Sequence, residues 1–419
     1  MIKLLIIADD LTGAIDAGTQ LAKEGINTFV TSNPDIDFNT SNQDISVLVF
    51  NSESRHINAN LAAQKVRSVA ESAKSAGVQY FFKKTDSTLR GNLGAELEAV
   101  YRATTQAQLP FIPAHPKSGR YTRNGYHYIG HKLLHETEFG NDPLEPISSS
   151  YIPEILKEQS ACKSGVISME ALRSDEDITF SDYEIIVFDC ENREDLQQIS
   201  IALQKNNLIN VIAGCAGFAE LLPELLQLDS RNREIPDIKG PALVINGSLN
   251  PVSLDQVNYA EKEGIKTYLV NQDIVACYGS KSNPLVENLL KDVQNDGIAS
   301  KSVILKTSEI SDEVAEQDPG LDAVMDLKEE YTVFATNMGK LVSDILKGSE
   351  FKTCVVFGGD TLMGIIEGLS ISGIYPVTEI FQGTALSEVK GHTGNYFFIT
   401  KPGGFGENDT IVRILGYIN

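Results

Sequence analysis

The sequence lacks the features that mark secreted and membrane proteins. Its first apolar run stops at Asp9, and no later run approaches the length of a membrane span, so we expect neither a signal peptide nor a transmembrane helix. The five cysteines show no C-x-x-C spacing and are odd in number. They are Cys162, Cys190, Cys215, Cys277 and Cys354. This usage is typical of reduced core residues, and we expect a cytoplasmic protein.

Positive charge is also scarce in the chain as a whole. There are 35 Lys and Arg against 57 Asp and Glu, which gives a formal net charge of -22 and argues against nucleic acids and anionic membranes as partners. One segment departs from this balance, because no acid occurs from Ala99 to His135. The cations in and just before it are Lys83, Lys84, Arg90, Arg102, Lys117, Arg120, Arg123 and Lys132. We interpret this segment as part of a local anion site.

Apolar runs that resemble buried strands alternate with helical patterns. The strand-like runs include ISVLVF (45–50), LPFIPA (109–114), YEIIVFD (183–189) and NVIAGCAG (210–217), and residues 61–77 show a helical pattern. This alternation predicts an α/β fold. Because 419 residues exceed the usual size of one core, we expect two α/β domains with mainly parallel sheets. The polar segment 228–241 suggests domains at 1–230 and 240–419.

The second domain lacks both GxxxxGK[ST] and GxGxxG, which disfavours an ordinary P-loop kinase and a Rossmann dehydrogenase. Instead, three Gly-rich turns join strand-like runs to helical ones. The residues at these turns that we select are Ser248, Gly358, Gly359, Asp360, Thr361, Lys401, Gly403 and Gly404. Glycine is common at any tight turn, but three such turns at helix N-termini favour a nucleotide-phosphate site.

In the first domain, the stretch FFKKTDSTLRGNLGAEL (81–97) combines cations, a carboxylate and a hydroxyl within a few positions. Its polar residues are Lys84, Asp86, Ser87 and Arg90, between a strand that ends near Lys83 and a helix that begins near Asn92. Taken alone, the stretch also suits a helix cap with an ion pair. Arg55, after another strand-like run, and the acids at the end of the first strand favour a ligand site instead.

Two acids, Asp9 and Asp10, follow the first buried strand directly. Adjacent side chains of a strand point to opposite sides, so the D-x-D arrangement of aspartyl-phosphate enzymes is absent. We expect one carboxylate to face a substrate hydroxyl and the other to be held by backbone N–H groups of the following turn.

His127, His131 and His135 recur every four residues and would form one stripe on a helix. No Cys or acid completes a metal-ligand spacing there, so we expect no metal site.

Nearly the whole chain resembles the four-carbon acid sugar kinase family. The resemblance rests on IADDLTGAIDAG, NSESR, KKTDSTLRGN, PAHPKSGRYTRNGYHYIG, ETEFGNDPLEP, AGCAGFAELL, NGSLNPVSLDQ, FGGDT and KPGGFG. One departure is Cys215, where the family more often has Ser. The resemblance implies an N-terminal sugar-acid-binding domain, a C-terminal nucleotide-binding domain and catalysis in the cleft between them.

The resemblance also implies roles for the residues selected above. The expected substrate ligands are Asp10, Arg55, Lys84, Asp86, Ser87 and Arg90, with Asp9 beside them. The expected ATP contacts are the selected residues of the Gly-rich turns. Asp10 is our choice for the catalytic base, with Asp86 as the competing base, and Lys84 and Arg90 would hold the carboxylate of the sugar acid. Mg²⁺ would bridge the ATP phosphates, with Asp360 as a candidate ligand.

These roles predict an ATP-dependent kinase acting on the terminal 4-hydroxyl group of a four-carbon sugar acid, D-threonate or D-erythronate. The alternatives are a 3-oxo-tetronate 4-kinase, a sugar-acid sensor without catalysis, and a phosphatase. The expected partners are the sugar acid and ATP. The sequence leaves the oligomeric state open, with a homodimer as one option.

Overall fold

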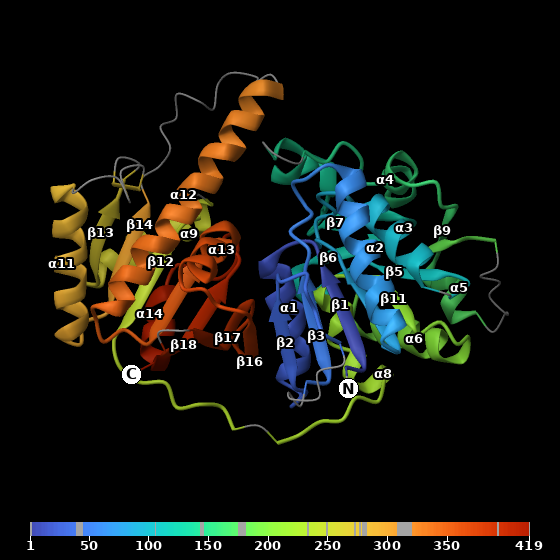
Figure 1. Cartoon of the computed structure of the whole chain (residues 1–419). Coiled ribbons are helices and arrows are strands. Elements are labelled where there is room, and N and C mark those ends of the chain that lie inside the picture. Colours follow the sequence, from blue (N-terminus) through green and yellow to red (C-terminus); the bar gives the residue numbers. More distant parts are fainter. Residues whose placement is uncertain are drawn as a thin grey trace. The chain divides into compact units, whose positions relative to one another are not determined.

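The computed structural model describes residues 2–38, 45–104, 106–142, 146–174, 182–232, 234–248, 250–271, 274–275, 278, 283–307, 321–391 and 394–418. The chain divides into two compact units, Met1–Arg233 and Glu234–Asn419 (Figure 1). Each unit is built on a sheet with helices, so the predicted α/β class is confirmed. Four cysteines are free and buried, and Cys277 lies outside the described residues.

The first unit contains a parallel sheet with the strand order β2-β3-β1-β4-β11-β5-β10-β9. Its strands are β1 (Leu4–Ala8), β2 (Thr28–Thr31), β3 (Val47–Asn51), β4 (Tyr80–Lys84), β5 (Leu109–Ile112), β9 (Ser164–Ile167), β10 (Ile185–Phe188) and β11 (Val211–Gly214). Its helices are α1 (Leu11–Ala22), α2 (Ala59–Ser75), α3 (Leu93–Ala103), α4 (Ile152–Gln159), α5 (Met169–Arg173), α6 (Arg193–Lys205), α7 (Ala216–Ala219) and α8 (Leu222–Leu225).

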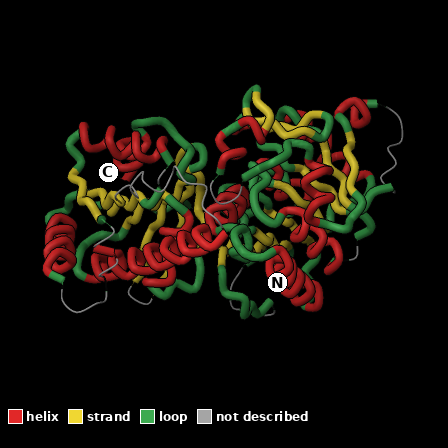
Figure 2. Tube along the Cα trace, turned by 90° about the horizontal axis from the view of Figure 1, so that it is seen from above, coloured by secondary structure: helices red, strands yellow, loops and turns green. Residues whose placement is uncertain are grey.

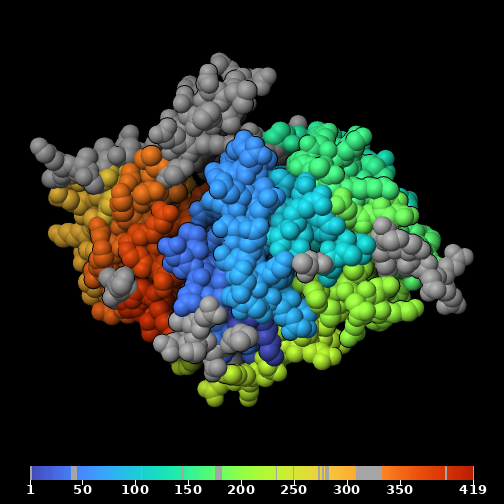
Figure 3. Space-filling model, turned by 45° about the vertical axis from the view of Figure 1, so that its right-hand side comes forward, coloured from blue at the N-terminus to red at the C-terminus, as the bar shows by residue number. Residues whose placement is uncertain are grey.

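Helices cover both faces of this sheet, which explains why β1 is apolar along its whole length. All five residues of β1 are buried. Leu5 and Ile7 belong to a core shared with α2, α3 and α4, whereas α1 contacts β1 and β3 and packs beside α7. The outer surface of α2 is visible in the space-filling view, where residues 59–75 are light blue (Figure 3). A parallel strand buried on both faces has no polar alternation, as the first run of the sequence predicts.

The second unit has five parallel strands continued by an antiparallel meander, in the order β13-β14-β12-β15-β18-β17-β16. Its strands are β12 (Ala242–Asn246), β13 (Lys266–Val270), β14 (Val303–Thr307), β15 (Thr353–Phe357), β16 (Ile374–Phe381), β17 (Thr384–Gly391) and β18 (Gly394–Lys401). Its helices are α9 (Pro251–Lys262), α11 (Pro284–Ile298), α12 (Leu321–Lys347), α13 (Gly359–Gly368) and α14 (Thr410–Ile418). In Figure 2 its strands (yellow) lie between helices (red).

A small antiparallel sheet in the first unit replaces the helix on which the histidine stripe depends. It consists of β6 (Arg120–Arg123), β7 (Tyr126–Ile129) and β8 (Lys132–Leu133). His127 lies in β7, His131 in the turn after it, and His135 in a short 3-10 helix. The condition of a helix is therefore not met, and the three histidines form no stripe.

Among the described residues, no helix combines the length and the apolar character that crossing a membrane requires.

Candidate functional site

The carboxylates of Asp9 and Asp10 lie at the carboxyl end of β1, and both contact the guanidinium of Arg55. Arg55 Nε donates to Asp9 Oδ2 at 2.7 Å, and its Nη2 lies 2.9 Å from Asp10 Oδ1. Burial alone would raise the pKa of Asp9, but Arg55, Lys83 and Lys84 outweigh that effect and lower it. Asp9 is therefore a buried carboxylate that stays ionised beside Arg55.

Asp10 also caps the N-terminus of α1. Its Oδ1 accepts a hydrogen bond of 3.0 Å from the backbone N–H of Gly13. We expected the backbone of the following turn to hold one of the two carboxylates and the other, Asp10, to face the substrate. The structure shows that the turn holds Asp10 itself, whereas Asp9 is held by the side chain of Arg55. Within the described chain no donor reaches Asp10 Oδ2, and 26% of the side chain is exposed. One oxygen is anchored and the other remains available to a ligand.

Asp86 is more tightly held than Asp10. Its Oδ2 accepts from Arg90 Nε at 2.6 Å and from Thr88 Oγ1 at 2.5 Å, and its Oδ1 lies 4.0 Å from Arg55. Burial would raise the pKa of Asp86, but Arg90 and Arg55 hold it well below its usual range. So acidic a carboxyl group is a weak proton acceptor.

Arg90 is balanced by two acids in the protein itself. Besides the contact to Asp86, its Nη1 donates to Asp142 Oδ2 at 3.2 Å. The same loop holds Leu89 at a φ of 59°, in the left-handed region that residues other than glycine rarely adopt, although Leu89 is buried. Strain of this kind is retained mostly at functional sites.

The two lysines at the end of β4 have different surroundings. Lys84 is buried, its Nζ donates to Thr85 O at 2.9 Å, and a Cβ on Gly13 would lie only 2.7 Å from that nitrogen. Lys83 is fully buried and its Nζ lies 2.8 Å from Glu96 Oε2, beneath the site. Lys84 is therefore placed at the start of α1, next to Asp10, whereas Lys83 belongs to the core.

Replacing Lys83 by methionine is expected to destabilise the first unit by about 3–5 kcal/mol, because it leaves the Glu96 carboxylate buried and unpaired. Denaturant unfolding measures this cost. The exposed ion pair of Lys3 and Asp229 supplies the control, since Lys3→Met should cost about 1 kcal/mol or less. Equal costs for the two variants would contradict a structural role for the buried pair.

Two residues outside the predicted ligand set contact Ser87, which we selected from the sequence. Arg120 Nη1 donates to Ser87 Oγ, and His127 Nε2 donates to Ser87 O at 2.9 Å while its Nδ1 accepts from Thr122 Oγ1 at 3.2 Å. Burial lowers the pKa of His127 to about 4, so its ring is neutral at pH 7. The acid-free segment of the sequence includes Arg120 and indicated an anion site. The contact between Arg120 and Ser87 could not be predicted, because it depends on the pairing of β6 with β7.

The structure thus brings together the predicted residues of the first unit at neighbouring strand ends. Asp9 and Asp10 follow β1, Arg55 follows β3, and the other four lie on β4 or in the loop after it. Cys215 follows the adjacent strand β11, and its Sγ donates to Ala114 O at 3.1 Å. Carboxyl ends of parallel strands are where α/β sheets bind ligands.

In the second unit, the loop after β18 turns its carbonyl groups inward. Lys401 Nζ donates to the carbonyl oxygens of Pro402 at 2.8 Å, Gly403 at 3.2 Å and Phe405 at 2.8 Å. From α9, Ser253 Oγ and Gln256 Nε2 reach two of these same oxygens. In the described part of the chain, the N–H groups of Gly403 and Gly404 donate to no acceptor. Such a loop can offer N–H groups to an anion.

Lys401 itself lies under this loop. It is 1% exposed, and its Nζ lies 4.5 Å from the centre of the Phe357 ring. Burial lowers the pKa of Lys401 to about 7. We selected Lys401 as an ATP contact, and its position is that of a residue that shapes the glycine turn from below.

The other two Gly-rich turns lie beside the first at adjacent strand ends. The Ser248 side chain borders Gly403, because a Cβ on Gly403 would lie 2.2 Å from Ser248 Oγ. Gly358 has a φ of 111°, which glycine tolerates, and the helix α13 starts at Gly359 with Asp360 exposed in its first turn. Thr361 is buried behind Gly247. All eight residues selected in this unit therefore lie at the ends of β12, β15 and β18, in the turns that follow or in the first turn of α13.

Substituting Gly403 by alanine should lower the affinity for ATP by about tenfold, because the new Cβ displaces Ser248 and reshapes the turn. Titration calorimetry with a non-hydrolysable ATP analogue measures it. Gly416→Ala in α14 is the control, since a Cβ there meets nothing within 4 Å. Unchanged affinity in a folded Gly403→Ala variant would remove this turn from the site.

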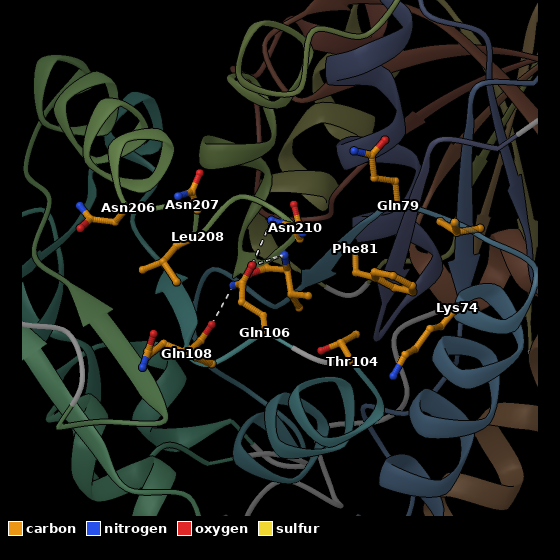
Figure 4. Close-up of a pocket in the computed structure, with 13 residues that line it drawn as sticks. Lys74, Gln79, Phe81, Thr104, Gln106, Gln108, Asn206, Asn207, Leu208 and Asn210 are labelled. Carbon is orange, nitrogen blue, oxygen red and sulfur yellow. Dashed lines mark hydrogen bonds between the residues drawn. The ribbon is translucent and has the colours of Figure 1, made fainter.

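A cavity of about 360 Å³ lies at the opposite end of the first unit's sheet (Figure 4). It is lined by residues at the amino ends of β4, β5 and β11, among them Gln79, Gln108 and Asn210. Gln106 fixes its wall by accepting from the N–H groups of Asn210 and Val211 at 3.1 Å. None of the selected residues lines it, so we do not assign the chemistry to this cavity.

Comparison with known proteins matches both halves of the chain. A family model described as a sugar-binding N-terminal domain matches residues 4–222, and one described as a nucleotide-binding C-terminal domain matches residues 243–411. The crystal structure of a Haemophilus influenzae protein has the same fold, with a TM-score of 0.72, 20% sequence identity, and coverage of 99% of this chain and 100% of that one.

Relatives with named activities span nearly the whole chain. A D-threonate kinase of Salmonella typhimurium is 29% identical over 99% of this chain and 98% of its own length. A D-erythronate kinase of Heliobacterium modesticaldum is 25% identical over 100% and 97%. A 3-oxo-tetronate kinase of Pectobacterium atrosepticum is 24% identical over 99% and 98%.

Proposed function

The chain belongs to the four-carbon acid sugar kinase family, and we propose that it transfers the terminal phosphoryl group of ATP to the 4-hydroxyl group of D-threonate or D-erythronate. The main support for this reaction is the geometry of Asp10, because one of its carboxylate oxygens is anchored and the other is available to a ligand. The cations around it suit an acidic substrate better than a neutral sugar.

We propose that Asp10 Oδ2 orients the 4-hydroxyl group and accepts its proton as the hydroxyl oxygen bonds to the γ-phosphorus. The bond from that phosphorus to the β–γ bridging oxygen breaks, and ADP leaves with the electron pair. Gly13 N–H and Arg55 keep the carboxylate in place by binding its other oxygen. Positioning and charge neutralisation supply most of the catalysis in phosphoryl transfer, and a base that orients the hydroxyl completes it.

The second unit is proposed to hold the phosphates of ATP at its three turns. The N–H groups of Gly403 and Gly404, the Ser248 hydroxyl and the first turn of α13 are the donors. Mg²⁺ in kinases is bound by one or two carboxylates together with phosphate oxygens, so the single exposed carboxylate of Asp360 fits that need. When bound there, Mg²⁺ would neutralise charge on the transferred group.

Incubation with ATP, Mg²⁺ and a panel of four-carbon acids tests the proposal. We expect ADP formation with D-threonate or D-erythronate, and a phosphate monoester at C4 by ³¹P NMR. If only 3-oxo-tetronate is phosphorylated, this protein would instead be a 3-oxo-tetronate kinase, like the relative from Pectobacterium atrosepticum. Binding of an acid without ADP formation would indicate a sensor, and phosphate release from a phosphorylated acid without ATP would indicate a phosphatase.

A further inference from the structure

Three cations of the proposed substrate site differ in how their charge is balanced. Arg55 contacts the carboxylates of Asp9 and Asp10, and Arg90 contacts those of Asp86 and Asp142. Each of these two guanidinium groups is thus already matched by at least two acids. A substrate carboxylate would have to compete with them, so Arg90 is a poor candidate for its main ligand.

Lys84 presents the opposite case. It is 4% exposed, its Nζ donates to the carbonyl of Thr85, and in the described part of the chain it forms no ion pair with a carboxylate. A buried ammonium without a carboxylate gains most from an anionic ligand. Its place at the start of α1 also leaves it near the Asp10 carboxylate, since a Cβ on Gly13 would lie within 2.7 Å of both.

Arg120 is brought to the same corner by three adjacent strands. Lys84 pairs with Gly214 in β11, and Gly214 pairs with Ile112 in β5. The chain that leaves β5 reaches His115, which forms a bridge with Arg120. From there the Arg120 guanidinium reaches the Ser87 hydroxyl, three residues beyond Lys84.

The ribbon that carries Arg120 is fixed against the Ser87 loop by a second contact. His127, which pairs with Thr122 across β6 and β7, donates to the Ser87 carbonyl. Burial and then the charge of Arg120 lower the pKa of His115 to about 4, and Lys84 adds to the effect. Both rings are therefore neutral at pH 7, and the charge of this corner comes from its lysine and arginine.

We infer that the carboxylate of the acid substrate binds to the Lys84 ammonium and the Arg120 guanidinium, beside Ser87, and that Arg120 sets the preference for an acid over a neutral polyol. This inference rests on the proposed function. Arginine can match a carboxylate with two parallel hydrogen bonds, which lysine cannot do. The 4-hydroxyl end of the substrate then extends toward Asp10.

The test compares D-threonate or D-erythronate with the neutral tetritols threitol and erythritol. Arg120→Gln should lower kcat/KM for the acid by about 30-fold or more, mainly through KM, while kcat/KM for the tetritol changes little. ATP affinity should be unchanged. Lys157→Gln, which removes an exposed cation on α4 outside this segment, should behave as the unmodified enzyme.

Two further variants keep the outcome decisive. Arg120→Lys retains the charge without the paired donors and should recover only part of the loss, and Lys84→Gln tests the subsite if Arg120→Gln does not fold. If a folded Arg120→Gln or Lys84→Gln enzyme keeps the full ratio of kcat/KM for the acid to kcat/KM for the tetritol, this inference is overturned while the proposed function stands. Absence of turnover with every four-carbon acid in the unmodified enzyme would instead overturn the proposed function.

Discussion

Replacing Asp10 by asparagine is expected to lower kcat by about two to four orders of magnitude, the usual range for loss of a general base. Asparagine keeps the shape of the side chain, and its amide oxygen can still accept from Gly13 N–H and Arg55. It cannot take a proton from the substrate hydroxyl. Binding of the sugar acid should therefore change much less than turnover. Steady-state kinetics and calorimetric binding of the acid without nucleotide separate the two effects.

Asp86→Asn provides the matched comparison for this experiment. Asp86 balances Arg90 and lies near Arg55, so its loss should disturb acid binding and stability as well as turnover. A KM effect at Asp86 and a kcat effect at Asp10 would agree with the assignment. Near-native kcat in Asp10→Asn, or a pure kcat loss in Asp86→Asn, would move the role of base to Asp86.

Much of the fold could be predicted because its signals are local. The apolar runs at 109–114, 183–189 and 210–217 contain β5, β10 and β11, the run at 45–50 covers β3 except its last residue, and the helical pattern at 61–77 overlaps α2. Each run is apolar because helices cover both faces of the sheet. The strand end near Lys83 and the helix start near Asn92 are also confirmed, since β4 ends at Lys84 and α3 begins at Leu93, directly after Asn92.

The sequence did not show the parts of the fold in which pairing between strands decides the structure. Residues 120–133 form a ribbon of short strands in which β7 pairs with β6 and β8. The four-residue spacing of the histidines contains no information about this pairing. The antiparallel meander of β16, β17 and β18 joins the parallel strands only through contacts that the local pattern does not specify. Strand pairing depends on tertiary contacts more than helix formation does.

The residues of the candidate site could be selected from the sequence, but the side chains that each of them contacts could not. Strand ends gave Asp10, Lys84 and Asp86 because neighbouring parallel strands end at the same edge. The balance of Arg90 by Asp142, 52 positions away, could not be read from spacing. This pairing is the reason why we propose Arg120, which the β6–β7 ribbon brings to Ser87, as a carboxylate ligand in place of Arg90.

Gly13→Ala is expected to abolish most of the activity of a protein that remains as stable as before. A Cβ at this position would lie 2.5 Å from Asp10 Oδ1 and 2.7 Å from Lys84 Nζ, the far ends of two side chains. Moving Asp10 Oδ1 aside weakens its cap bond to Gly13 N–H, which costs about 1 kcal/mol. Alanine in a helix is more stable than glycine by up to about 1 kcal/mol, so the two effects offset each other and the helix survives. The displaced groups are the proposed base and a proposed carboxylate ligand. Displacement by about 1 Å in such a site costs on the order of 100-fold in rate.

Thermal unfolding and steady-state kinetics on the same preparation check this separation of stability from activity. Gly416→Ala makes the matched control, because it adds the same methyl group to α14, where nothing lies within 4 Å. Because no cap is disturbed there, it should gain up to about 1 kcal/mol of stability and keep full activity. ATP affinity should be normal in both variants, since Gly13 belongs to the first unit and the phosphate turns to the second. A fully active Gly13→Ala enzyme would show that the positions of Asp10 and Lys84 do not limit the reaction, and with them the proposed site would have to be given up.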